Sequence, residues 1–334
     1  MQTYGEVTDK MKVAICYTKE RVDLLSDSFA EGVKSLGDSV LEIRNKDDLE
    51  KLEGCDISFQ VGETTRYELL CFHSDPKLMA ETGYMRVIIK NKQTELNKRR
   101  LILDCGILDD DRFKDLDSRY FSVGMDGIKG NAEFFNKNSP RDRWKKRKLR
   151  IKQWRKEGEN ILIIGQTHYG AGLVHVGTES DPMSNMWTDP THYYHNLVRR
   201  IREYTDRPIV FRTHPIGDKE IRNRIRPPED VENVTVTDSR EIPIKQDLQN
   251  THCVVTRTSN GAVDAIFNGV PTITEDPACL AYEVSGHSIK EIESPIKPSR
   301  NQWLYNMSYA EWSVDEMQQG LLWQHIRNNI NEKN

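Results

Sequence analysis

The segment 258–265, which reads TSNGAVDA, has the composition of a phosphate-binding turn. It follows an apolar run at 252–256 that predicts a strand, and it opens a helix predicted over 259–267. The start of a helix presents unpaired backbone N–H groups and about half a positive charge, which suits a diphosphate. An ordinary helix cap with small packing residues is the alternative. The residues expected to contact the ligand are Thr258, Ser259, Asn260 and Gly261.

A second polar turn, FRTHP at 211–215, follows another predicted strand in the same half of the chain. Arg212 and His214 at the carboxyl end of a strand can bind a phosphate or stabilise a departing one. Proline fixes the turn after them. A structural histidine at a strand end is the alternative, but the combination of Arg, His and Pro favours a functional site.

Three more residues follow predicted strands of this half. Glu275 and Asp276 come after the run 271–274, where carboxylates can accept hydrogen bonds from ribose or sugar hydroxyls; helix capping is the alternative. Gln166 opens a loop at 166–177 whose glycines let a ligand approach the backbone. Because parallel strands share one carboxyl edge, where open α/β sheets bind ligands, these turns predict a single site.

Two series of alternating strands and helices must position these turns. Apolar runs in the first series predict strands at 12–17, 40–43, 57–61, 101–104 and 120–123, and helices at 22–36, 47–53 and 76–98. The second series predicts strands at 160–165, 208–212, 234–236, 252–256 and 271–274, helices at 187–204 and 259–267, and two Trp-rich helices after residue 300. This rhythm predicts an α/β fold with a parallel sheet in each half.

Composition sets the limits on the class of protein. A chain of 334 residues suits two domains, and its 37% hydrophobic residues allow sizeable cores. The formal net charge of -4 excludes a globally basic DNA-coating protein. No apolar run reaches the roughly 18 residues of a membrane span, and the N-terminus lacks the apolar core of a signal peptide. Six scattered cysteines without a C-x-x-C pair predict neither a zinc site nor disulfides, so we expect a cytoplasmic protein.

The stretch 141–156 differs sharply from its surroundings, with ten Lys or Arg residues against one Asp. It also contains Trp144 and Trp154. One interpretation is a solvated helix face and a linker between domains. The other is a ridge that contacts phosphates, with the two tryptophans packed on the domain or stacked on bases. The nucleic-acid-binding residues of the second interpretation are Arg143, Lys145, Lys146, Arg147, Lys148 and Arg150.

The second half of the chain resembles the donor domain of nucleotide-sugar glycosyltransferases of the GT-B architecture. RTHP at 212–215 and SNGAVDAIFNGVP at 259–271 are similar to the "HP … S-x-x-x-x-A-x-x-x-G-x-P" pattern of capsule-type glycosyltransferases. The segments 154–166, 205–209 and 312–323 resemble phage-encoded glycosyltransferases, some of which modify hydroxymethylated pyrimidines in DNA. The resemblance covers roughly residues 119–326.

The resemblance implies two facing Rossmann-like domains. The expected division is an acceptor domain at 1–150, a nucleotide-sugar domain at 151–300, and helices at 301–334 that cross back onto the first domain. It also implies a nucleoside-diphosphate sugar as donor, most simply a UDP-sugar, with no metal or other cofactor required. Arg212 and His214 would then serve in catalysis as well as in donor binding. The acidic run at 109–111 is interpreted as a solvated turn.

An inverting sugar transfer needs a base near the acceptor hydroxyl. Asp104 is the first candidate, because it ends the predicted strand at 101–104. Glu63 and Asp126 are alternatives, and a retaining reaction would need no such base. A cap or turn role for Asp104 remains open.

The preferred acceptor is a 5-hydroxymethylpyrimidine in double-stranded DNA, in the host cytoplasm if the protein is phage-encoded. A surface polysaccharide or glycolipid is the nearest alternative acceptor. A nucleotide-sugar epimerase of the same architecture and a non-catalytic DNA-binding protein also remain open.

Overall fold

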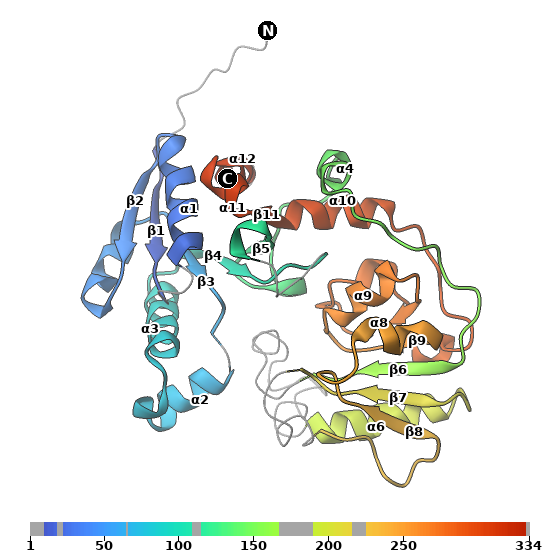
Figure 1. Cartoon of the computed structure of the whole chain (residues 1–334). Coiled ribbons are helices and arrows are strands. Elements are labelled where there is room, and N and C mark those ends of the chain that lie inside the picture. The colour runs from blue at the N-terminus through green and yellow to red at the C-terminus, as the bar shows by residue number, and fades with distance from the viewer. Residues whose placement is uncertain are drawn as a thin grey trace. The chain divides into compact units, whose positions relative to one another are not determined.

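A computed structural model describes residues 10–18, 23–64, 66–108, 115–166, 190–215 and 225–331. The chain divides into two compact units. The first unit comprises Met1–Ile128, Ala132–Phe135 and Ala310–Asn334, and the second comprises Lys129–Asn131 and Asn136–Tyr309. Figure 1 shows the elements of both units along the chain.

The first unit is built on a six-stranded sheet in the order β11-β5-β4-β3-β1-β2. Four neighbouring strands are parallel, whereas β5 runs antiparallel to β4, and β11 antiparallel to β5. The strands are β1 (Lys12–Cys16), β2 (Ser39–Ile43), β3 (Ile57–Val61), β4 (Arg99–Asp104), β5 (Tyr120–Met125) and β11 (Glu311–Ser313). The helices are α1 (Asp23–Ser35), α2 (Arg66–Ser74), α3 (Glu81–Glu95), α11 (Val314–Gln318) and α12 (Leu321–Asn331).

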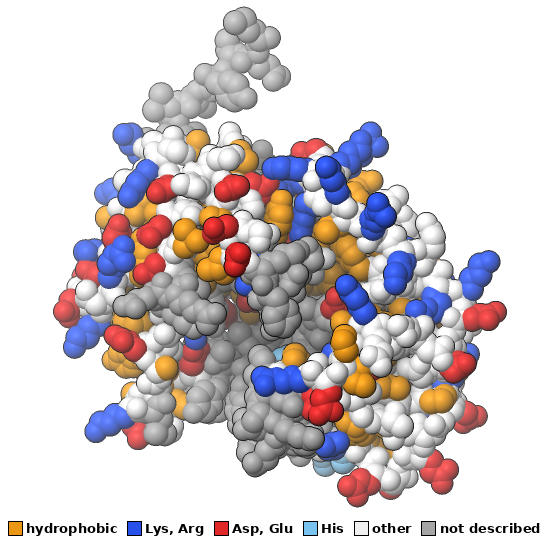
Figure 2. Space-filling model, viewed as in Figure 1, with side chains coloured by type: hydrophobic (Ala, Val, Ile, Leu, Met, Phe, Trp, Pro, Cys, Tyr) orange, Lys and Arg blue, Asp and Glu red, His pale blue; other side chains and the backbone are white. Residues whose placement is uncertain are grey.

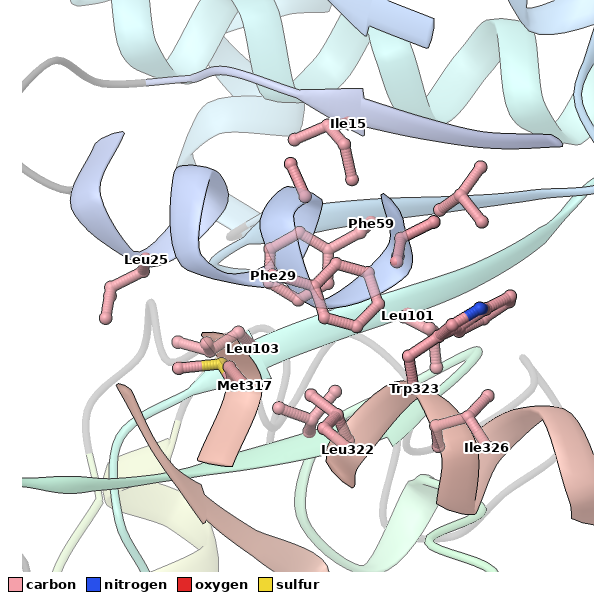
Figure 3. Packing of buried hydrophobic residues seen from close by; sticks show 14 of the residues in the cluster. Ile15, Leu25, Phe29, Phe59, Leu101, Leu103, Met317, Leu322, Trp323 and Ile326 are labelled. Atoms are coloured by element: carbon pink, nitrogen blue, oxygen red, sulfur yellow. The ribbon is translucent and has the colours of Figure 1, made fainter. Parts of the chain in front are cut away.

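The core of the first unit joins both ends of the chain. Phe29 of α1 stacks on Phe59 of β3 with ring centroids 4.2 Å apart, and Trp323 of α12 meets Phe29 edge to face. Figure 3 shows these rings with apolar side chains from β1, β4 and α11. The indole Nε1 of Trp323 donates to Asp38 Oδ2 at 2.7 Å, just before β2. The first unit therefore needs residues from α11 and α12 to complete its core.

The second unit has a five-stranded sheet in the order β10-β9-β6-β7-β8, and all its strands are parallel. The strands are β6 (Asn160–Ile164), β7 (Ile209–Arg212), β8 (Val234–Thr237), β9 (Thr251–Val255) and β10 (Thr272–Ile273). The helices are α4 (Asp142–Arg147), α6 (Pro190–Arg202), α8 (Ile244–Asp247), α9 (Gly261–Phe267) and α10 (Asn301–Ala310). In chain order the strands are arranged 5-4-1-2-3, which is the doubly wound arrangement of nucleotide-binding folds.

The predicted fold class, an α/β chain with a sheet of largely parallel strands in each half, is confirmed. Several local predictions are corrected. The strand at 120–123 is antiparallel, because its connection from β4 holds no crossover helix in the described residues and a parallel return needs one. The helix predicted over 76–98 is α3 alone after a short 3₁₀ turn, with α2 before it. Strand β11 interrupts the two helices expected after residue 300.

The three tryptophans after residue 300 are buried. Trp303, Trp312 and Trp323 are each at most 3% exposed. All six cysteines are free thiols, and only Cys105 is not fully buried.

Candidate functional site

The strand order of the second unit creates a switch point at the carboxyl ends of β6 and β9. From β6 the chain winds outward through β7 and β8, and it then returns to β9 on the other side of β6. Helices on either side of such a point leave a crevice where open α/β sheets bind ligands. Two of the predicted site residues, Gln166 and Thr258, meet there.

Gln166 and Thr258 are held together by two hydrogen bonds. Gln166 Nε2 donates to Thr258 Oγ1 at 2.7 Å, and the Thr258 backbone N–H donates to Gln166 Oε1 at 3.1 Å. The backbone N–H of Gln166 donates to the hydroxyl of Tyr194 on α6 at 2.7 Å. Burial raises the pKa of Tyr194, so its hydroxyl stays protonated. The two side chains are therefore engaged with each other, and they join the segments that follow β6 and β9.

The side chain of Arg212 has three partners in the second unit. Its side chain is only 9% exposed and forms an ion pair with Asp247 of α8. Nη1 also donates to the carbonyl oxygen of Ile242 at 2.7 Å, and Nη2 to that of Ser239 at 3.2 Å. In this structure the charge of Arg212 is therefore paired inside the second unit, and its predicted contact with a diphosphate stays a prediction. Arg212 ties β7 to the segment that precedes α8.

Two other guanidinium groups lie at the same edge of the sheet, and sequence reasoning missed both. Arg257 is 2% exposed, and its Nε donates to Asp276 Oδ2 at 2.8 Å. Arg200 of α6 pairs with Glu275 at 2.5 Å, near the surface. Asp276 is therefore engaged, and its second oxygen accepts the N–H of Ala278 at 2.9 Å. Arg257 could have been found from the sequence, because a charged residue directly after an apolar strand indicates a polar site at the edge of the sheet.

Glu275 is the more accessible of the two predicted carboxylates. Its side chain is 35% exposed, and that of its partner Arg200 is 46% exposed. An exposed ion pair is weak, so its members can exchange partners with a ligand at low cost. The buried pairs of Arg212 and Arg257 cannot do so without leaving a carboxylate unpaired.

The turn before α9 also differs from the prediction. The helix begins at Gly261 rather than at Ser259, and Ser259 Oγ accepts the N–H of Gly261 at 3.2 Å. A Cβ on Gly261 would lie 2.8 Å from Ile164 Cδ1, so this glycine allows α9 to pack against β6. The structure therefore gives this glycine a packing role, and its predicted role in phosphate approach stays a prediction. The side-chain oxygen of Asn260 is buried and accepts no hydrogen bond from the described residues.

His214 lies two residues after β7 and is partly exposed, at the same edge of the sheet. The rest of the loop that follows Gln166, with His168, Tyr169 and His175, lies outside the described residues. The acidic run 109–111 also lies outside them.

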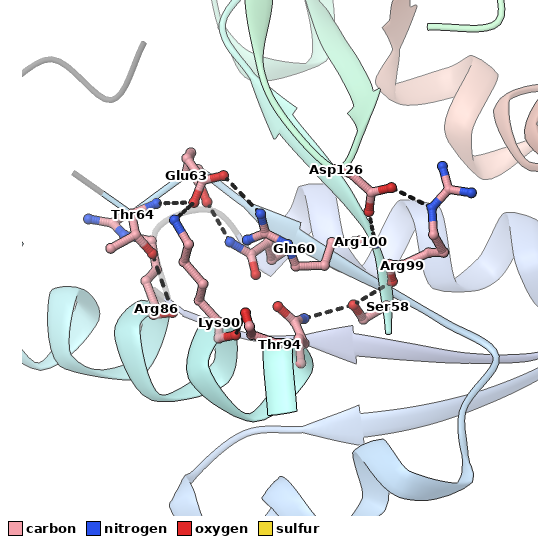
Figure 4. Close-up of polar contacts among 12 residues, drawn as sticks. Ser58, Gln60, Glu63, Thr64, Arg86, Lys90, Thr94, Arg99, Arg100 and Asp126 are labelled. Carbon is pink, nitrogen blue, oxygen red and sulfur yellow. Dashed lines mark hydrogen bonds and ion pairs between the residues drawn. The ribbon is translucent and has the colours of Figure 1, made fainter. Parts of the chain in front are cut away.

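The candidate bases of the first unit have distinct surroundings (Figure 4). The side chain of Glu63 is fully buried between Lys90 and Arg100, at 3.5 and 3.4 Å. Asp126 accepts the backbone N–H of Arg100 at 2.8 Å in the turn after β5. The Glu63 carboxylate is therefore closed to a substrate, whereas the Asp126 side chain is exposed and pairs with Arg99. Asp104, the last residue of β4, is partly exposed, and its carboxylate forms no hydrogen bond or ion pair with other described residues.

The polar cluster around Glu63 stabilises the layer between the sheet and α3. Burial lowers the pKa of Lys90, and the neighbouring charge of Arg100 adds to this effect. Gln93 Nε2 of α3 donates to Ser58 Oγ of β3 at 2.7 Å in the same layer. These contacts fix α3 on β3 and β4, which is a structural role.

The predicted nucleic-acid-binding residues lie in α4 and in the segment after it, all within the second unit. Arg143 Nε donates to the carbonyl oxygen of Ser308 at 2.8 Å. Arg147 is partly buried. The four other side chains are exposed: Lys145, Lys146, Lys148 and Arg150.

Within the described part of the chain, no helix is long and apolar enough to cross a bilayer. The same residues contain no group of three His, Cys, Asp or Glu side chains that could hold a metal ion.

Comparisons with solved structures find similar α/β proteins at low sequence identity. The β-Kdo 2,4 transferase KpsC of Thermosulfurimonas dismutans has 13% identity and a TM-score of 0.49, over 90% of this chain and 91% of that chain. The UDP-GlcNAc 2-epimerase of Methanocaldococcus jannaschii has 12% identity and a TM-score of 0.33, over 96% and 100%. HepE of Anabaena, solved with UDP-glucose, has 10% identity and a TM-score of 0.32, over 95% and 100%.

No protein-family model matches the chain, and no curated protein sequence is similar to it at a significant level.

Proposed function

We propose that the protein is a glycosyltransferase that takes a sugar from a nucleoside-diphosphate sugar, most simply a UDP-sugar, and transfers it to a hydroxyl group. The observation that carries this proposal is the doubly wound sheet of the second unit, with polar residues gathered at its switch point between β6 and β9. A nucleotide is the ligand that this arrangement most often accepts.

The polar groups left available at this edge fit a sugar nucleotide. The buried side-chain oxygen of Asn260 needs a donor, which a ribose or sugar hydroxyl supplies. Glu275 has an exposed carboxylate for another hydroxyl. Arg200 can release Glu275 and turn to a phosphate oxygen. His214 can stabilise charge on the departing diphosphate.

Asp104 is the proposed base in the first unit. Of the three candidate carboxylates, only that of Asp104 has no hydrogen-bond or ion-pair partner among the described residues, and the residue is partly exposed. A base with these properties can accept the proton of an acceptor hydroxyl as the sugar is transferred. The proposed acceptor is a 5-hydroxymethylpyrimidine in DNA, with a surface polysaccharide or glycolipid as the alternative.

Calorimetric binding of UDP and UDP-glucose tests the donor site. We expect Asn260→Ala to weaken UDP-glucose binding at least tenfold, about 1.4 kcal/mol. The matched control is Asn268→Ala at the other end of α9, whose amide donates to Asp264 within the helix. Equal affinities of the two variants, or no nucleotide binding by the wild type, would contradict the proposal.

The reaction is tested by incubation with a panel of nucleotide sugars and with hydroxymethylated DNA, plain DNA and polysaccharide. Digestion to nucleosides and mass measurement then identify the product. We expect Asp104→Asn to lower transfer at least tenfold while UDP binding is unchanged. Asp117→Asn, an exposed site of the same unit, is the control. Full activity of Asp104→Asn would remove Asp104 as the base.

A further inference from the structure

The segment 141–156, called the basic strip below, is the most strongly charged part of the chain. It contains ten Lys and Arg residues and a single acidic residue, Asp142. The strip starts with α4, turns at Lys148, which has a φ of 52°, and continues without regular structure to β6. Figure 2 shows Lys and Arg side chains gathered over the region of α4.

The backbone of the basic strip is fixed to the second unit. The N–H of Lys152 donates to the carbonyl oxygen of Phe267 at 2.9 Å, and that of Arg155 to Gly269 at 2.7 Å. Gly269 has a φ of +73°, and a Cβ there would lie 2.0 Å from the carbonyl oxygen of Gln153. The strip therefore has a defined path against the end of α9, so its charges are preorganised.

Both tryptophans of the basic strip are used in packing. Trp144 meets Phe267 with ring centroids 6.0 Å apart. The guanidinium of Arg300 lies 3.9 Å from the Trp154 ring centroid, and the Trp154 Nε1 donates to the carbonyl oxygen of Pro298. Surfaces that bind single-stranded nucleic acid present aromatic faces to the bases. The contacts of the two tryptophans therefore favour the first of the two alternatives, packing on the domain.

What the strip presents to solvent is positive charge. The charged side chains of five exposed residues form no hydrogen bond or ion pair with the described residues: Arg141, Lys145, Lys148, Arg150 and Lys156. The only carboxylate of the strip, Asp142, accepts the hydroxyl of Tyr309 at 2.9 Å. Exposed cations without aromatic partners suit the phosphate backbone of a duplex, which binds through charge alone.

The basic strip lies at the opposite edge of the sheet from the candidate site. Arg155 Nη1 donates to the carbonyl oxygen of Thr251, the first residue of β9, whereas Thr258 comes three residues after Val255, the last residue of that strand. Figure 1 shows the green chain after α4 leading to the start of the β6 arrow. With five residues in β6, the two edges are about 16 Å apart. The strip therefore cannot contact a sugar at the switch point.

We propose that the basic strip is a docking surface for the phosphate backbone of double-stranded nucleic acid, separate from the sugar-transfer site. An anionic membrane fits less well, because such surfaces insert apolar side chains beside their cations. None of the exposed large hydrophobic residues found in the described chain belongs to the strip. The proposal does not depend on glycosyl transfer.

The test is fluorescence anisotropy of a labelled duplex of about 20 base pairs at several salt concentrations. Five phosphate contacts predict a slope of log K against log salt of about -4.5. The variant Lys145→Glu/Lys148→Glu/Arg150→Glu should weaken binding at least tenfold and reduce the slope by about 3. The control Lys34→Glu/Lys245→Glu/Lys290→Glu changes three exposed lysines elsewhere by the same total charge.

Equal losses in the two triple variants would overturn the proposal, because net charge alone would then explain them. It would also be overturned if wild-type protein bound the single strand, an acidic polysaccharide or phosphatidylglycerol vesicles more tightly than the duplex. UDP binding by the strip variant should equal that of the wild type. If neither the wild type nor the strip variant binds UDP, the proposed function is contradicted, but the proposed docking surface is not.

Discussion

Replacement of Arg212 by methionine separates a structural role from a role in ligand binding. The change keeps most of the side-chain volume but leaves Asp247 buried without its cation, at 5% side-chain exposure. Thr237 Oγ1 still donates to Asp247 Oδ2 at 3.1 Å, so part of the carboxylate remains satisfied. Removal of one partner of a buried pair costs about 3–5 kcal/mol, and the remaining donor places this case near 3 kcal/mol.

The double variant Arg212→Met/Asp247→Leu supplies the matched control. Removing both charges leaves no unpaired ion, so the double variant should be more stable than Arg212→Met alone. Hydrogen exchange followed by mass spectrometry measures the free energy of opening in peptides from β7 and β8. Peptides from β1 and β3, in the other unit, should be unchanged and serve as an internal reference.

The UDP affinity of Arg212→Met decides between the two roles. If Arg212 is structural, the variant destabilises β7 but binds UDP within about twofold of wild type wherever it remains folded. A loss of stability below about 1 kcal/mol together with a loss of UDP binding would refute the structural role. Arg212 would then return to the ligand site.

Three further outcomes follow from the described contacts. Gly261→Ala should lower the free energy of unfolding by about 1–2 kcal/mol, because the added Cβ meets the flexible end of the Ile164 side chain. Adding Ile164→Val should restore part of that loss, and urea unfolding measures both variants. Burial, aided by the charge of Arg207, lowers the pKa of His252, so below about pH 6.5 the unfolded state binds more protons than the folded state, and the free energy of unfolding falls as the pH drops. This dependence on pH should be weaker in His252→Gln. An equal dependence in the variant and the wild type would exclude His252 as its cause. Asp38→Ala leaves the Trp323 indole and the Met11 N–H without their acceptor and should destabilise the first unit by about 2–4 kcal/mol; exchange in second-unit peptides should stay unchanged.

Much of the secondary structure could be predicted from local patterns. Apolar runs such as those of β1 and β6 match the structure within a residue or two, because a buried parallel strand needs apolar side chains on both faces. Helix α1 follows a predicted amphipathic stretch, and Gly37 after it has a φ of +86°. The placement of polar turns at the ends of β6, β7, β9 and β10 was also predictable.

The partners of charged side chains were not predictable. Arg212 and Asp247 are 35 residues apart, and Arg257 and Asp276 are 19 apart. Nothing in either local sequence shows which carboxylate will face which guanidinium. The burial of Glu63 likewise depends on α3 covering β3, which brings Lys90 next to it.

By itself, the sequence determined where the strands and helices form and which turns carry polar residues, because backbone conformation responds to neighbours along the chain. Only the tertiary structure decided which of those residues remain available to a ligand. In the folded protein Arg212 pairs with Asp247, Gly261 packs against Ile164, and the basic strip lies at the amino edge of the sheet. The physical reason is that desolvation and ion pairing depend on segments brought together by folding, which sequence spacing does not specify.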